Sequence, residues 1–104
     1  MGGRVVLDSK KVEETSVVTF DFTSRLNVGA TISTQVVTSE VYSGVDASPS
    51  AMISGSASAS GTVVTQLITG GVLGVLYLLE CVITTSDGQT LSLNGFLAVA
   101  PDIT

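Results

Sequence analysis

The sequence predicts an all-β fold, in which a sandwich of about six or seven antiparallel strands follows an extended N-terminal arm. Short runs rich in β-branched and aromatic residues recur along the chain, separated at regular intervals by turns that contain Gly, Asp, Asn or Pro. No segment has the apolar spacing of an amphipathic helix. The 104 residues suffice for one core without metal or disulfide. We divide them into an arm over residues 1–14 and a β-sandwich domain over residues 15–104.

The stretch from Gly70 to Gly88 is expected to supply the central strand, because its apolar residues form a continuous block from Val75 to Thr85. With a period of two, one face is wholly apolar and is assigned to the core: Tyr77, Leu79, Cys81 and Ile83. The opposite face carries Leu76, Leu78, Glu80 and Val82, and we expect a second subunit to cover it. A transmembrane helix is the alternative, but the block is shorter than the roughly 20 apolar residues that a bilayer requires and contains Glu80.

The chain before this strand is expected to begin with the arm, for which a disordered terminus is the alternative. A strand follows over Ser16–Phe22, with Val18, Phe20 and Phe22 facing inward. After a turn at residues 26–29, a second strand spans Thr31–Tyr42, where a β-bulge near Val36 would restore a single apolar face. Residues 44–50 are predicted to form a loop, residues 51–61 a weak strand or loop, and residues 62–69 a firm strand.

The last two strands are expected to form a hairpin, because Asp87-Gly88 favours a two-residue turn. The final strand spans residues 89–100, with Leu91, Leu93, Leu97 and Val99 in phase, and ends at Pro101. We interpret Asn94-Gly95 within it as a bulge. This strand pattern is typical of an immunoglobulin-like or fibronectin-type sandwich, in which Tyr77 would form a tyrosine corner by bonding the backbone of residues 70–74.

The charge pattern argues against nucleic acid as a partner. The net charge is −5 and the only bases are Arg4, Lys10, Lys11 and Arg25, all in the first quarter of the chain. A phosphate-binding surface needs clustered bases. Charged residues make up only 12% of the chain, against a typical quarter, which suits a protein that assembles with others.

No residue pattern predicts catalysis, a cofactor or a metal. The chain has no histidine, which excludes histidine-based nucleophilic devices. The single cysteine, Cys81, is expected to be buried and inert. Residues 70–74 lack the lysine of a phosphate loop. Glu13, Glu14 and Asp21 lack the spacing of a calcium loop, and an exposed arm explains the two glutamates more simply.

The residues that we expect to mediate subunit contacts are Arg4, Lys10, Lys11, Arg25, Leu76, Leu78 and Glu80. A buried charge needs a partner, so Glu80 is predicted to pair with one of the bases of an adjacent subunit. A solvated glutamate is the alternative. The N-terminal residues contain no apolar h-region, so we expect no secretory signal and expect the protein to be made and kept in a reducing cytoplasm.

Five motifs, in order and spacing, carry a family resemblance that spans about Lys10 to Pro101. They are Lys10-Lys11-Val12-Glu13-Glu14, Thr19-Phe20-Asp21-Phe22 with Arg25-Leu26, Gly29-Ala30-Thr31-Ile32, the stretch from Gly70 to Tyr77, and Thr84-Thr85-Ser86-Asp87-Gly88. The sequence thereby resembles the fiber-tail adaptors, small structural proteins of tailed bacteriophages. Ala30 stands where this family has Glu, and Lys11 where Pro is common.

The resemblance implies a virion protein of the phage tail or neck, made in the cytoplasm of a host bacterium and without catalytic residues. It implies an immunoglobulin-like fold assembled as a homo-oligomer, with neighbouring tail, neck or fiber proteins as further partners. A capsid decoration protein is the alternative, since it would have the same composition. An adhesion or carbohydrate-binding module would need exposed aromatic residues, and the chain has no Trp and two Tyr.

Overall fold

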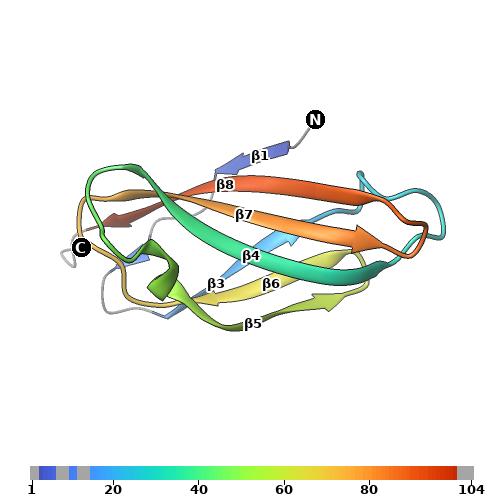
Figure 1. The fold of residues 1–104 in the computed structure, drawn as a ribbon, viewed down its shortest axis with the longest axis horizontal. Helices are drawn as coiled ribbons and strands as arrows, with labels where there is room; N and C mark the ends of the chain where they lie inside the picture. Colours follow the sequence, from blue (N-terminus) through green and yellow to red (C-terminus); the bar gives the residue numbers. More distant parts are fainter. Residues whose placement is uncertain (1–2, 7–9, 12–14, 101–104) are drawn as a thin grey trace.

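Two β-sheets face each other across one apolar core (Figure 1). The computed structural model describes residues 3–6, 10–11 and 15–100, of which residues 3–6, 10, 11 and 100 are described by their backbone alone. The larger sheet has the order β1 (Gly3–Val6), β8 (Thr90–Ala100), β7 (Leu76–Thr85) and β4 (Ile32–Ser43), and β2 (Lys10–Lys11) also pairs with β8. The smaller sheet has the order β3 (Ser16–Asp21), β6 (Val63–Ile68) and β5 (Ile53–Ser60). The predicted all-β fold is therefore confirmed.

The core lies between β7 and β8 on one side and β3 and β6 on the other. Tyr77, Leu79, Cys81 and Ile83 of β7 are all 0% exposed, as their shared face predicts. Val18 and Phe20 of β3, and Phe22 just after it, meet them from the side of the smaller sheet, and Leu93, Leu97 and Val99 meet them from β8. The predicted inward faces of these strands are thus confirmed.

Strand β4 contains bulges, but not where the sequence suggested one. Its pairing with β7 shifts register at Ser33 and again at Tyr42. The prediction of a bulge near Val36 is wrong, because Val36 simply faces outward and is 58% exposed. The extra residue at Ser33 instead turns Ile32 toward the core.

The β7–β8 hairpin is confirmed, but its predicted two-residue turn is wrong. Three residues, Ser86, Asp87 and Gly88, separate Thr85 from Gln89, whose carbonyl accepts a 2.9 Å bond from Thr85 N. Gly88 takes the left-handed conformation (φ 87°), whereas Asp87 does not. This is the three-residue loop in which a type I turn is followed by a left-handed glycine.

Two further corrections concern β8 and the start of β5. Asn94 and Gly95 pair with Glu80 and Leu79 without a register shift, so the predicted bulge is absent. The loop predicted over residues 44–50 ends in a 3-10 helix, η1 (Pro49–Met52). The weak strand expected over residues 51–61 is confirmed as β5, an edge strand. Its backbone bulges around the buried Gln66 amide, which donates to the carbonyls of Ser54 (3.0 Å) and Gly55 (3.2 Å).

The N-terminal strands lie along the free edge of β8 (Figure 1). Residues 3–6 pair in parallel with residues 93–96, and Lys10 and Lys11 with Val99 and Ala100. These pairings give partners to backbone groups of β8 that would otherwise form a bare edge. The rest of the predicted arm and the predicted end of the last strand at Pro101 lie outside the described residues.

The Tyr77 hydroxyl joins the core to the loops at one end of the molecule. It accepts a 2.8 Å bond from Val72 N, which confirms the predicted bond to the backbone of residues 70–74. It also donates a 2.7 Å bond to the Asp46 carboxylate. The connection between β4 and η1 and the connection between β6 and β7 are therefore held together by one buried side chain.

Replacing this hydroxyl should weaken the fold. We expect Tyr77→Phe to lower the free energy of unfolding by about 1–2 kcal/mol, because Val72 N and Asp46 each lose a partner. Urea denaturation would measure this loss. The matched control is Tyr42→Phe, at a tyrosine that is 60% exposed, and we expect it to change stability by less than about 0.5 kcal/mol. Equal effects of the two variants would contradict the role of the Tyr77 hydroxyl.

The buried thiol of Cys81 is expected to make the stability of the fold decrease at alkaline pH. Burial raises the pKa of its thiol from 9.0 to about 12, and the nearby charge of Glu80 adds to the rise. The unfolded chain thus releases this proton near pH 9, while the folded chain keeps it. The contribution of the thiol to the free energy of unfolding is therefore complete below pH 9 and is lost as pH rises toward about 12. Burial also raises the pKa of Tyr77, which acts in the same direction above its ordinary value of 10.

We therefore expect the stability of the wild-type protein to fall more steeply than that of Cys81→Ala between about pH 9 and about pH 11, by up to about 1.4 kcal/mol per pH unit. Urea denaturation at a series of pH values measures both slopes. Because only the difference in slope matters, the cost of the cavity that alanine leaves does not affect the comparison. Parallel slopes would show that the thiol does not titrate in this way.

Candidate assembly surface

The outward face of β4, β7 and β8 brings the predicted contact residues of the central strand together. Leu76, Leu78, Glu80 and Val82 are all half-buried on this face. Pairing places Leu78 between Glu40 and Phe96, and Glu80 between Thr38 and Asn94. We call this surface, with its flanking residues on β4 and β8, the outer face.

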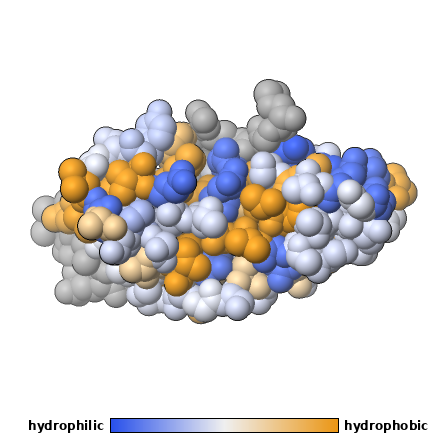
Figure 2. All heavy atoms as spheres, in the orientation of Figure 1, coloured by the Kyte–Doolittle hydropathy of each residue, from blue (hydrophilic) through white to orange (hydrophobic). Residues whose placement is uncertain are grey.

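The outer face is more apolar than a solvated sheet face usually is. Besides the residues of β7, it carries Val36 and Tyr42 of β4, which are 58% and 60% exposed. The Tyr42 ring meets Phe96 of β8 edge to face at a centroid distance of 4.6 Å, spanning β7. Figure 2 shows apolar side chains gathered over the middle of the molecule, interrupted by hydrophilic ones.

The charges of the outer face are acidic. Glu40 and Glu80 lie on neighbouring strands, and Glu80 pairs directly with Thr38. Among the side chains that the structure describes, the only base is Arg25, and its guanidinium donates a 3.3 Å bond to the carbonyl of Ser92. Neither carboxylate is thus balanced by a described base, and the expected pairing of Glu80 requires a base from elsewhere.

The four predicted bases are distributed along β8. Arg25 lies against Ser92 of β8, at the level of Val82. Arg4 is in register with Asn94, the residue that pairs with Glu80, whereas Lys10 is in register with Val99. The side chains of Arg4, Lys10 and Lys11 lie outside the described part of the structure. A direct pairing of these bases with Glu80 therefore stays a prediction.

The sequence analysis missed several members of the outer face, namely Val36, Glu40, Tyr42, Asn94 and Phe96. The alternation of β4 and β8 could have placed each of them outward. Only the strand order shows that they flank Leu78 and Glu80. Asn94 adds a polar feature, because its Oδ1 atom is buried without a hydrogen-bond partner among the described residues.

The described residues offer little else that would support chemistry. They contain no group of three or more potential metal ligands. Cys81 is 0% exposed, so the prediction that it is buried is confirmed. Burial also raises the pKa of its thiol, which disfavours the reactive thiolate. Within the same residues, the structure has no helix with the length and hydropathy that a membrane span requires.

These features define a small structural β domain whose outer face is suited to contact with other proteins. Over residues 10–97, the sequence matches the family described as podophage GP4 fiber-tail adaptor protein gp77. The chain belongs to this family, and the resemblance inferred from its motifs is confirmed. No curated protein matches the sequence. The family is one of structural adaptors and not a class of enzymes, and it gives no support to a capsid decoration protein.

Proposed function

We propose that this protein is a multi-copy adaptor in the virion, which links the phage tail to its fibers or to neighbouring tail or neck proteins. The observation that carries the proposal is the outer face of a chain that belongs to the fiber-tail adaptor family. That face combines half-buried leucines with two carboxylates and no described base of its own. The protein is made in the host bacterial cytoplasm and enters the particle as a structural part.

The strand order supports an immunoglobulin-like assignment within the all-β class. In that fold, strands B, E and D share one sheet, while C, F and G share the other. Counting β3 as strand B, the present sheets β3-β6-β5 and β4-β7-β8 have the same order. Tyr77 is the second residue of the strand equivalent to F, and its hydroxyl bonds Val72 N, as a tyrosine corner requires.

In an assembly of several copies, each outer face would be covered by a neighbouring copy. Covering a leucine that is still partly exposed contributes a fraction of the roughly 1.5–3 kcal/mol that full burial provides. Glu80 must gain a basic partner when it is covered, because an unpaired buried charge is costly. The N-terminal segment of a neighbouring copy would supply Arg4, Lys10 or Lys11.

The two surfaces in this contact are different: an acidic, apolar face on one copy meets a basic segment on the next. Repeated head to tail, such a contact is heterologous and gives a closed ring or a filament, whereas a reciprocal contact between two copies gives a two-fold dimer. We propose the head-to-tail form. A ring suits a component placed around the axis of a tail.

The solution mass of the protein tests the assembly. We expect light scattering after size-exclusion chromatography to give a discrete oligomer, and Leu78→Asp to give a folded monomer because it places a charge in the contact. The matched control is Val17→Asp on the outward face of the smaller sheet, where Val17 is 59% exposed. We expect this control to keep the oligomer. An L78D protein that still assembles would overturn the contact through the outer face.

Removal of residues 1–14 tests the basic segment separately. We expect the truncated protein to keep its β-sheet circular dichroism and to lose the oligomer, because the bases that balance Glu80 are then absent. Since this deletion also removes β1 and β2 from the edge of β8, Arg4→Gln/Lys10→Gln/Lys11→Gln is the sharper variant, with the same expected loss. Unchanged assembly of both proteins would contradict the role of the segment.

The place in the virion is tested with phage particles produced without this chain. We expect these particles to carry DNA-filled heads and to lack attached fibers under the electron microscope. Addition of the purified protein, together with an extract that supplies fibers, is expected to restore infectivity. Particles that attach their fibers in the absence of the chain would overturn the adaptor function.

A further inference from the structure

One end of the molecule exposes an unusual number of apolar side chains. It is formed by the connection between β4 and η1 (residues 44–48) and the connection between β6 and β7 (residues 69–75). Val45 is 85% exposed, Leu73 53% and Val72 42%. Tyr42, 60% exposed, lies where β4 enters the first connection. We call this region the apolar end; it is on the left in Figure 1, and Figure 2 shows apolar side chains gathered there.

The loops of the apolar end are held in one arrangement. The Tyr77 hydroxyl bonds both Asp46 and Val72, one from each connection. Ser48 N donates a 2.9 Å bond to the Asp46 carboxylate, and Val75 N a 3.1 Å bond to the Val72 carbonyl. Loops that only connect strands are usually polar and mobile. Here the apolar side chains are displayed by a bonded scaffold, so little ordering is needed when a partner binds.

The packing of two glycines brings the connections close to the body of the domain. At Gly44, a Cβ atom would lie 2.9 Å from Val75 Cγ2, and at Gly71 it would lie 2.7 Å from Val99 Cγ2. Both residues also have a positive φ, which favours glycine. Side chains are thus excluded at these two positions, and a hollow stays open beside Gly71.

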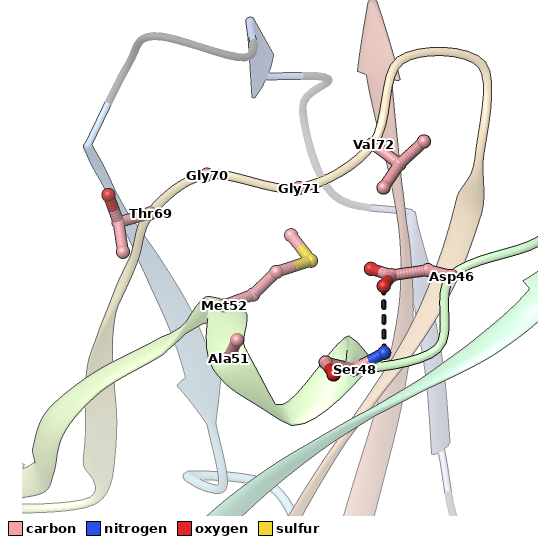
Figure 3. Close-up of a pocket in the computed structure, with 8 residues that line it drawn as sticks. All are labelled: Asp46, Ser48, Ala51, Met52, Thr69, Gly70, Gly71 and Val72. Atoms are coloured by element: carbon pink, nitrogen blue, oxygen red, sulfur yellow. Dashed lines mark hydrogen bonds between the residues drawn. The ribbon is translucent and has the colours of Figure 1, made fainter.

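Figure 3 shows this hollow, which has a volume of about 240 Å³. Met52 of η1 reaches into it from one side, and the backbone of Gly70 and Gly71 forms the opposite side. Asp46 and Val72 lie at its margin. The hollow has room for an aliphatic side chain of a partner, with a carboxylate next to it.

The charge of the apolar end favours a basic partner. Asp46 is its only titratable acid or base, apart from the hydroxyls of Tyr42 and Tyr77. The pKa of Asp46 is lowered, first by the bond from Ser48 N and then by the bond from Tyr77, so the carboxylate is ionised at neutral pH. β2 runs nearby, since Lys10 is in register with Val99, but its side chains are not described. Within the described side chains, Arg25 is the only base, and it bonds Ser92 instead.

We propose that the apolar end is the docking site for a different virion protein, which inserts an aliphatic side chain next to Asp46 and places a flanking Lys or Arg on this carboxylate. The inference rests on the proposed adaptor function and names the second surface that an adaptor requires. A second copy of this chain fits less well, because its charged side chains within the described residues are all acidic apart from Arg25. Its remaining bases, Arg4, Lys10 and Lys11, lie in the N-terminal segment that we propose contacts the outer face of a neighbouring copy.

Restoration of infectivity to particles that lack the chain tests this site. We expect Val45→Asp to restore about tenfold fewer infectious particles than the wild-type protein, or fewer still, because the charge must be desolvated at the contact. The matched control is Val28→Asp, at a fully exposed valine in the connection between β3 and β4 at the opposite end. It is expected to restore infectivity like the wild type.

Asp46→Asn tests the charge. Its amide oxygen can still accept the bond from Ser48 N, whereas its NH2 group replaces the oxygen that accepts from Tyr77. Tyr77→Phe, which loses the same bond and keeps the charge, is therefore its matched control. We expect a loss of about fivefold or more from this variant, since a charge-assisted bond is roughly twice as strong as a neutral one. Full activity of V45D and D46N would overturn the docking site. Equal losses in V45D and V28D would do the same.

The solution mass of V45D distinguishes the two possible occupants. We expect it to equal the wild-type mass, because the partner is a different protein. A mass that falls to that of a monomer would show that the apolar end contacts another copy, which overturns the proposal. If the wild-type protein itself restores no infectivity, the proposed function fails. If the wild type and V45D restore it equally, only the docking site fails.

Discussion

Burial of one face of β7 is the constraint on which both the fold and the outer face depend. Tyr77, Leu79, Cys81 and Ile83 are 0% exposed against β3 and β6. Because side chains alternate along a strand, this burial obliges the intervening residues to face outward. A slip of one residue would place Glu80 in the core. The register that makes the core therefore also fixes which leucines remain outside it.

Tyr77 extends this constraint to the end of the molecule. Its ring belongs to the core, whereas its hydroxyl lies between Asp46 and Val72 of two different connections. The position of the loops consequently follows from the packing of β7, without a disulfide or a metal among the described residues. The outer face and the apolar end are thus two surfaces ordered by the same strand.

Features set by the residue pattern within one strand or one turn could be predicted from the sequence, whereas features set by how two strands align could not. The inward faces, the Tyr77 bond and the burial of Cys81 follow from alternation and from nearby glycines. The bulge at Ser33 escaped prediction because it depends on how β4 aligns with β7. Likewise Leu78 and Glu80 were identified on the outer face, but Tyr42 and Phe96 were not, since they meet only because β4 and β8 flank the same strand.

The parallel pairing of β1 with β8 has a consequence for biosynthesis. β1 is the first described strand to leave the ribosome, and its partner, about 90 residues later in the chain, is the last. The N-terminal strand has no place in the larger sheet until translation has reached β8. A nascent chain whose synthesis stops before β8 cannot complete this sheet. Two strands that are synthesised first and last thus become neighbours in the sheet. Only a chain that has been synthesised through β8 offers its neighbours a covered β8 edge.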